Sequence, residues 1–182
     1  MAAKPSSAVQ PETLPSSASP NVSAEVDPRS ASQTLAFFKS FRLNRSLPDI
    51  SNTDDFYGAF IRGFLKVDRI QRGRITCTVS VRHPITNLFE TMHGGGVAAV
   101  AELMAIACAR TVVAEDKELF LGELSISYLS GAPINAEVLA DASVEKSGRN
   151  LTVIGLEFKL KGTGKLIYTA RATFYNLPVA KL

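Results

Sequence analysis

Residues 93–114 decide the fold, and they read His-Gly-Gly-Gly-Val-Ala-Ala-Val-Ala-Glu-Leu-Met-Ala-Ile-Ala-Cys-Ala-Arg-Thr-Val-Val-Ala. Alanine, leucine and methionine favour helix, so we predict one long helix from Gly94 to Glu115. Between Gly96 and Ala109 its only polar residue is Glu102. A helix that is apolar all round is buried on all sides. Because a sheet covers only one side, a symmetric partner subunit is the simplest cover for the other.

The segments on both sides of this helix have the period of β-strands. Residues 74–81 alternate strictly, with Ile75, Cys77 and Val79 on one face, which is typical of a half-buried strand. Short glycine-containing turns separate the later segments, so neighbouring strands run antiparallel. The order predicts an α+β fold with a long central helix wrapped by a curved antiparallel β-sheet of about six strands. The predicted strands are residues 64–70, 74–81, 120–130, 137–146, 151–161 and 165–176.

Composition divides the 182 residues into four parts. Residues 1–34 are rich in Ser, Pro and Ala without an aromatic residue, and we expect them to be disordered. Residues 35–55 are predicted to form a short docking helix and a linker. Residues 56–177 form the main domain, and residues 178–182 form a C-terminal tail.

Several classes of function are disfavoured by composition. The net charge is +3 without a dense basic run, so we expect no nucleic-acid partner. No apolar run reaches the roughly 18–20 residues of a membrane span. The pairs Cys77/Cys108 and His83/His93 lack the close spacing of zinc ligands, and we expect neither a metal nor another cofactor.

Glu102 is the first candidate for chemistry. One interpretation is a structural ion pair with Arg62 or Arg171. The other is a general base whose pKa is raised by burial in an apolar helix. The sequence leaves both open.

The glycines at the helix start are the second candidate. Glycine lets a ligand approach the backbone, and the first helical N–H groups have no internal partner. Gly94 and Gly95 therefore suit the stabilisation of an oxyanion, although tight packing alone would also require glycine.

His93 and Glu102 lie roughly 13 Å apart along a helix axis. One chain cannot bring both to one carbon atom, but two helices packed antiparallel across a two-fold axis can.

The stretch Asn87-Leu-Phe-Glu-Thr-Met-His93-Gly94-Gly95, with an acid at Glu102, resembles the small hotdog-fold acyl-CoA thioesterases of the PaaI-like and thioesterase superfamily member 2 type. The likeness covers about residues 56–176. It implies a hotdog fold and a homodimer that often pairs into a tetramer. It also implies metal-free hydrolysis of fatty or aryl acyl-CoA to CoA and free acid.

The resemblance also implies a role for each residue. The N–H of Gly94 would polarise the thioester carbonyl, Asn87 would help hold the attacking water, and His93 would orient the loop or the substrate. Glu102 of the facing subunit would be the general base or, as an alternative, a nucleophile. Gly95 is assigned to substrate binding. Asn87 could instead only cap a turn.

The basic residues near the turns are candidates for binding the CoA phosphates. Arg149 and Lys165 are assigned this role, against the alternative of solvated turn charges.

Two departures from the family pattern keep other functions open. The closest relatives carry Asp where this chain has Glu102. Their serine on the strand after the helix aligns near Leu121, with Ser125 and Ser127 on the same strand. A non-catalytic acyl-CoA-binding or scaffolding protein is therefore the alternative, and a dehydratase ranks below it.

The chain ends in Ala180-Lys181-Leu182, which is close to the peroxisomal address Ser-Lys-Leu. We expect a peroxisomal import receptor as partner and the peroxisome as location. An organelle reached through an N-terminal transit peptide, or the cytoplasm, is the alternative.

Overall fold

The computed structural model describes residues 22–40, 54 and 56–179. The chain forms two units, Met1–Asp54 and Asp55–Leu182, and each is described by itself. The predictions for residues 1–21 and 41–53, and for the tripeptide 180–182, lie outside the described residues.

The first unit contributes one helix, α1 (Pro28–Ser40). It begins inside the tract that we predicted to be disordered, because Asp27 and Pro28 form a helix start. The Asp27 carboxylate accepts hydrogen bonds from the backbone N–H groups of Arg29 and Ser30, at 3.0 Å each. Proline suits the first helical position, where no N–H is needed. The described part of α1 covers residues 34–40 of the helix predicted over 34–44, and its docking role stays a prediction.

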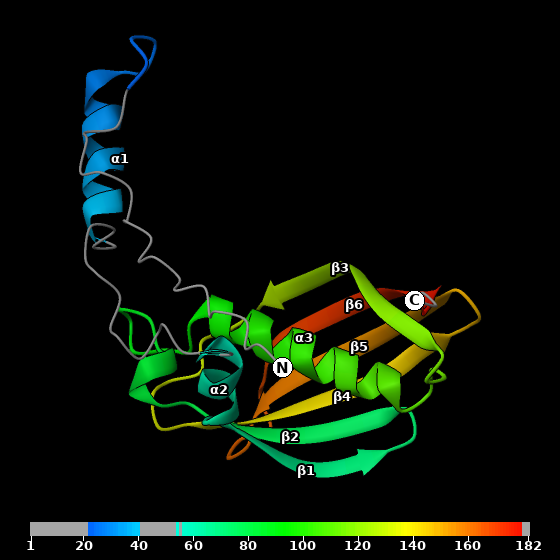
Figure 1. The fold of residues 1–182 in the computed structure, drawn as a ribbon. Helices are drawn as coiled ribbons and strands as arrows, with labels where there is room; N and C mark the ends of the chain where they lie inside the picture. The colour runs from blue at the N-terminus through cyan, green and yellow to red at the C-terminus, as the bar shows by residue number, and fades with distance from the viewer. Residues whose placement is uncertain (1–21, 41–53, 55, 180–182) are drawn as a thin grey trace, which may run out of the picture. The chain divides into compact units, whose positions relative to one another are not determined.

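The second unit is built on one sheet of six antiparallel strands in the order β1-β2-β4-β5-β6-β3, which confirms the predicted sheet. Figure 1 shows that β1 and β3 form its two edges. The strands are β1 (Leu65–Gln71), β2 (Arg74–Ser80), β3 (Lys117–Tyr128), β4 (Glu137–Ser147), β5 (Leu151–Leu160) and β6 (Leu166–Pro178).

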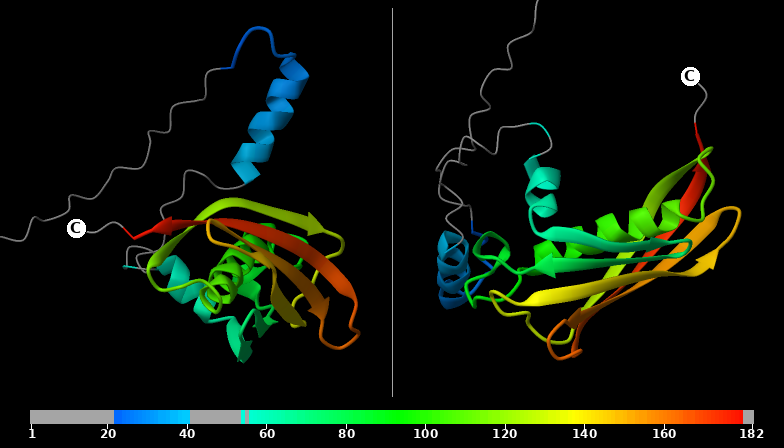
Figure 2. Two further views of the ribbon diagram at one scale, coloured as in Figure 1. Left: turned by 90° about the vertical axis from the view of Figure 1, so that its right-hand side faces the viewer. Right: turned by 90° about the horizontal axis from the view of Figure 1, so that it is seen from below.

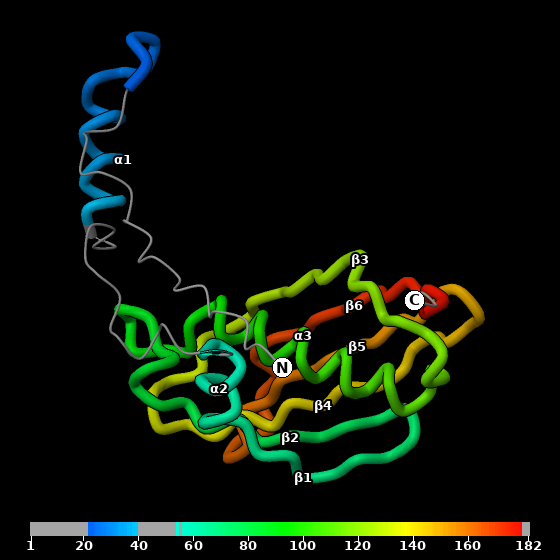
Figure 3. Tube along the Cα trace, viewed as in Figure 1, coloured from blue at the N-terminus to red at the C-terminus, as the bar shows by residue number. Residues whose placement is uncertain are grey.

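The long helix α3 (Gly94–Arg110) lies across the concave face of this sheet, which curls around it (Figures 1 and 2). The tube in Figure 3 shows the same crossing of α3 over the middle strands. A short helix α2 (Phe56–Arg62) precedes β1, and a 3-10 turn η2 (His83–Ile85) follows β2. The core lies between α3 and the sheet, and its large fully buried side chains include Met104, Val100, Val79, Phe158 and Phe174.

The helix α3 is shorter than predicted, because it ends at Arg110 rather than near Glu115. The Thr111 hydroxyl donates to the carbonyl of Cys108 at 2.7 Å and closes the last turn. The following Val112 and Val113 are β-branched, and such residues lose side-chain freedom in a helix.

This chain covers α3 on one side only, and the expected cover of the other side by a partner subunit stays a prediction. The concave face covers one side of the helix, and the opposite side, with Glu102, Leu103 and Ala107, is exposed. Within the described residues, no second layer of this chain covers it.

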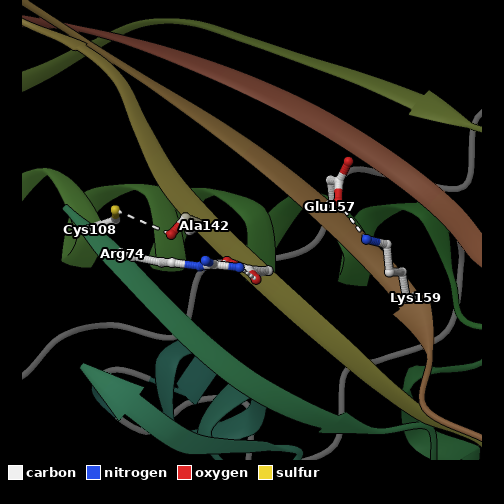
Figure 4. A network of polar contacts seen from close by, with 6 residues as sticks. Arg74, Cys108, Ala142, Glu157 and Lys159 are labelled. Carbon is white, nitrogen blue, oxygen red and sulfur yellow. Dashed lines mark hydrogen bonds and ion pairs between the residues drawn. The ribbon is translucent and has the colours of Figure 1, made fainter. Parts of the chain in front are cut away.

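The convex face of the sheet is polar. Figure 4 shows Lys159 pairing with Glu157 along β5, at 2.7 Å. Arg74 donates from Nε to the Asp141 carboxylate at 2.9 Å, and this hydrogen bond raises the pKa of Arg74. The same view shows the Cys108 thiol of α3 donating to the carbonyl of Ala142 on β4. Helix α3 therefore packs directly on the central strands.

None of the described helices is long and apolar enough to cross a membrane.

Candidate functional site

The N-terminus of α3 presents a free backbone donor. His93 is the N-cap residue, and its Nδ1 accepts the N–H of Gly95 at 3.0 Å. Among the described residues, no acceptor takes the N–H of Gly94 or of Gly96. These free donors lie at the positive end of the helix dipole, so the site can stabilise a developing negative charge.

The structure distinguishes Gly94 from Gly95, because only one of their two N–H groups is available to a ligand. The N–H of Gly94 is available to a ligand, as an oxyanion hole requires. The N–H of Gly95 is engaged by His93, so its assignment to substrate binding requires His93 to turn away. His93 caps the first turn of α3 through this bond, and its role in orienting the loop or the substrate stays a prediction.

Tyr128 is a site residue that the sequence analysis missed. Its hydroxyl donates to the carbonyl of Gly94 at 3.1 Å, and its ring lies 5.7 Å from the ring of Tyr168, edge to face. Tyr168 accepts the N–H of Ala132 through its own hydroxyl at 3.0 Å, and burial raises its pKa. The two rings therefore brace the start of α3. The position of Tyr128 at the end of a strand carried no signal of this contact.

The Asn87 side chain holds the loop that leads into α3. Its Oδ1 accepts the N–H groups of Phe89 and Thr91, at 2.9 and 3.2 Å. Its Nδ2 donates to the Thr91 hydroxyl at 3.0 Å. This geometry corresponds to the turn-capping alternative for Asn87. One hydrogen of Nδ2 remains for a water molecule, so the predicted role in holding water stays a prediction.

Glu102 lies on the outer side of α3, at the edge of an apolar cavity of about 680 Å³. It is exposed, and no described residue forms a hydrogen bond or an ion pair with its carboxylate. Within this chain, the carboxylate is therefore accessible to water and to a ligand. The cavity is lined by residues from α2, β1, β2 and α3: Tyr57, Gly58, Ile61, Arg62, Leu65, Val67, Ile70, Ile75, Cys77, Ala99, Glu102, Leu103, Met104, Ile106 and Ala107.

Arg171 does not form the ion pair with Glu102 that was the structural interpretation of this residue. That guanidinium pairs with Glu145 at 3.1 Å. Arg62 lines the same cavity as Glu102 and is the only cation in its lining. The cavity therefore combines an apolar wall with one carboxylate, that of Glu102, and one guanidinium, that of Arg62.

Gly94 and Glu102 are not brought together within one chain. They lie eight residues apart on the same helix, which is roughly 12 Å along its axis. A carbonyl carbon bound near the N–H of Gly94 is therefore out of reach of the Glu102 carboxylate of the same chain.

The two basic residues assigned to CoA lie at opposite ends of the sheet. Lys165 precedes β6 and donates from Nζ to the Ser130 hydroxyl at 3.1 Å, at the end of β3 that carries Tyr128. Arg149 lies in the turn between β4 and β5. The intervening strand has 10 residues, which separates its ends by about 30 Å. One chain therefore cannot hold the same phosphate group with both residues.

The two serines of β3 point away from α3. Leu124 pairs with the buried Ala172, whereas Ser125 pairs with the exposed Arg171. Side chains alternate between the faces of a strand, so Ser125 and Ser127 share the convex face. Leu121 lies on the concave side and packs against the core. No described serine of β3 therefore lies on the concave face of the sheet, where α3 packs.

The cysteines are structural. Cys77 and Cys108 are buried free thiols, and burial raises the pKa of each to about 11. Such thiols are poor nucleophiles at neutral pH. Within the described ranges, no group of three His, Cys, Asp or Glu side chains is placed to hold a metal ion.

A curved antiparallel sheet wrapped around one long helix, with a free glycine N–H at the helix start, defines the hotdog class of protein. The mouse protein named thioesterase superfamily member 2 has this fold, with a TM-score of 0.59 at 24% identity over 66% of this chain and 87% of that one. This likeness confirms the predicted hotdog fold.

Sequence comparison agrees with the fold. Residues 89–167 match the model of the thioesterase superfamily. A putative esterase of Caenorhabditis elegans is 29% identical over 109 residues, which span 60% of this chain and 64% of that protein. Human acyl-coenzyme A thioesterase 13 is 29% identical over 104 residues, 56% of this chain and 71% of that one. Residues 89–167 are therefore similar to the thioesterase superfamily, in agreement with the resemblance seen in the sequence.

Proposed function

We propose that this protein is an acyl-CoA thioesterase that hydrolyses the thioester of fatty or aryl acyl-CoA to free acid and CoA. The free N–H of Gly94 carries the proposal, because it is a donor at a helix start with no other acceptor among the described residues. The accessible Glu102 carboxylate beside an apolar cavity supports it, as does the likeness to human acyl-coenzyme A thioesterase 13.

The proposed site combines two copies of the chain. The N–H of Gly94 from one copy donates to the thioester oxygen, and Glu102 of the other copy faces the carbonyl carbon. A homodimer with antiparallel α3 helices would bring the two together. Its further pairing into a tetramer is part of the same proposal.

The chemistry is general-base hydrolysis. Glu102 takes a proton from water as the water oxygen bonds to the carbonyl carbon, and the negative charge moves to the carbonyl oxygen. The N–H of Gly94 and the helix dipole stabilise this oxyanion. The C–S bond then breaks, and the CoA sulfur leaves and takes the proton from Glu102. Direct attack by Glu102, with a mixed anhydride as intermediate, is the variant of this mechanism.

The direct test is the release of free thiol from a panel of short, long and aromatic acyl-CoAs. Steady turnover by the wild-type chain supports the proposal. Stoichiometric binding of acyl-CoA without release of thiol would instead identify a non-catalytic acyl-CoA-binding or scaffolding protein. The convex-face position of Ser125 and Ser127, away from Glu102, is the observation that favours this second function.

Peroxisomal location is the remaining part of the proposal. It is supported by the similarity of Ala180-Lys181-Leu182 to a receptor-read address. A fluorescent reporter that ends in these residues should enter peroxisomes, and the same reporter without Lys181 and Leu182 should not. An equal cytoplasmic distribution of both would contradict this part.

A further inference from the structure

The loop that leads into α3 displays two apolar side chains at its tip. Leu88 is 91% exposed and Phe89 is 84% exposed, the highest values among the large hydrophobic side chains that the structure describes. Single exposed apolar residues are common, but two adjacent ones on a well-braced loop require a reason.

The loop is held rigidly. The N–H of Asn87 donates to the carbonyl of Thr91 at 2.8 Å, and the N–H of Ile134 donates to the carbonyl of Glu90 at 2.8 Å. The Asn87 carboxamide adds the bond to the N–H of Phe89 at 2.9 Å. These bonds order the backbone of the loop that carries the two side chains, which lowers the entropy cost of binding a partner.

The cavity beside α3 exposes apolar side chains, which match the apolar side chains at the tip of the loop. Its exposed apolar residues include Ile70, Val67 and Leu103. Beyond Glu102 along the helix, the lining continues with Leu103, Ile106 and Ala107. Ile106 lies one turn after Glu102, so both occupy the same side of α3.

The composite site places the loop of one copy against this stretch of the other. If Gly94 faces Glu102 of an antiparallel partner helix, the segment that precedes Gly94 in one chain lies toward the C-terminal half of α3 in the other. Phe89 belongs to this segment, and Ile106 and Ala107 belong to that half of α3. Figures 1 and 2 show the loop extending beyond the start of α3 rather than back along the helix, so it is free to reach a second chain.

We propose that Leu88 and Phe89 of one copy insert into the α3 side of the cavity of the other copy and form the wall against which the acyl chain packs. This inference rests on the proposed thioesterase function and names the acyl-binding contribution of the partner. The two side chains are specificity-determining residues. A long acyl chain contacts them, and a short one ends before it reaches them.

A disulfide test addresses the docking without reference to activity. Phe89→Cys is combined in turn with Leu103→Cys, Ile106→Cys and Ala107→Cys, and the full chains are oxidised. We expect a cross-linked species of twice the chain mass with at least one pair, because a disulfide needs Cα atoms within about 7 Å. The native thiols are buried and do not compete.

The matched control pairs Phe89→Cys with Ser143→Cys, since Ser143 lies on the convex face with Gly155 opposite. This pair should give no cross-link. The absence of a cross-link from all three α3 positions, or an equal cross-link from the control, overturns the proposal.

A kinetic test addresses specificity. Leu88→Ser with Phe89→Ser should lower kcat/KM for long-chain acyl-CoA about tenfold relative to a short-chain substrate, as expected for lost apolar contact. Leu177→Ser removes an exposed leucine at the far end of β6 and should leave the ratio unchanged. An unchanged ratio in the loop variant overturns the specificity role. Failure of the wild type to release thiol contradicts the proposed function instead, and the cross-link still reports on the docking.

Discussion

Replacement of Glu102 by glutamine tests the base in the proposed mechanism. Glutamine keeps the size of the side chain and removes the charge. Because Glu102 is exposed and makes no hydrogen bond or ion pair with a described residue, its loss leaves no buried group unsatisfied. We expect a change in the free energy of unfolding within about 0.5 kcal/mol.

The effect on catalysis should be much larger. Loss of a general base lowers the rate by at least ~10²-fold, which corresponds to about 3 kcal/mol of transition-state stabilisation. The assay is the release of CoA thiol under saturating acyl-CoA, with urea unfolding and sedimentation as checks on folding and assembly.

Two variants calibrate the result. Glu102→Asp retains the charge but withdraws the carboxylate by about 1.5 Å, so it should retain more activity than Glu102→Gln. Glu115→Gln removes an exposed charge just beyond α3 and should turn over like the wild type. Full turnover by Glu102→Gln would refute the assignment of the base.

Three further outcomes follow from the contacts of the site. Asn87→Ala should lower the free energy of unfolding by about 1–3 kcal/mol, since it leaves loop N–H groups without an acceptor; urea unfolding measures this, and Asn87→Asp, which keeps the acceptor, should recover most of it. Tyr128→Phe should lower kcat without changing acyl-CoA binding, because it frees only the carbonyl of Gly94; an unaltered kcat would contradict the positioning role. The pKa values of Cys77 and Cys108 rise from 9.0 to about 11 on folding, so stability present below pH 9 should fall as the pH rises above 9. Urea titrations between pH 8 and 10 measure this fall, and a Cys77→Ala/Cys108→Ala variant should lack it.

Much of the domain could be predicted from the period of its apolar residues. The alternation of Ile75, Cys77 and Val79 marks β2, and tight turns order the remaining strands. The helix start at Gly94 follows from the glycine run. The helix end was harder to predict, because the residues after Arg110 are still mostly apolar and the helix ends there through the Thr111 cap and the β-branched Val112 and Val113. The start of α1 was hidden by the Ser- and Ala-rich composition around Asp27 and Pro28.

The site was predictable in its residue types more than in its contacts. The spacing of Gly94 and Glu102 means that a site using both residues requires two copies of the chain. The exposure of Glu102 could not be inferred, since an apolar helix does not reveal which of its sides the same chain covers. Tyr128 acts through a contact between segments 34 residues apart, and no local pattern marks such a contact. The separation of Arg149 and Lys165 does follow from antiparallel topology, because their turns flank the same strand.

A complementation experiment tests the two-copy site most directly. Gly94→Pro removes the N–H and is compatible with the helix start, because Gly94 is the first helical residue and His93 before it has the extended backbone that precedes proline (φ −64°, ψ 135°). The Cβ that proline adds would lie 3.5 Å from the ring of Tyr128, an ordinary van der Waals contact. Each single variant, Gly94→Pro or Glu102→Gln, should be inactive as a homodimer. When the two are mixed and allowed to exchange subunits, half of the dimers carry one intact site, and activity should return to about a quarter of the wild-type value. A mixture that stays as inactive as its two components, although exchange has occurred, would contradict a site shared between two chains.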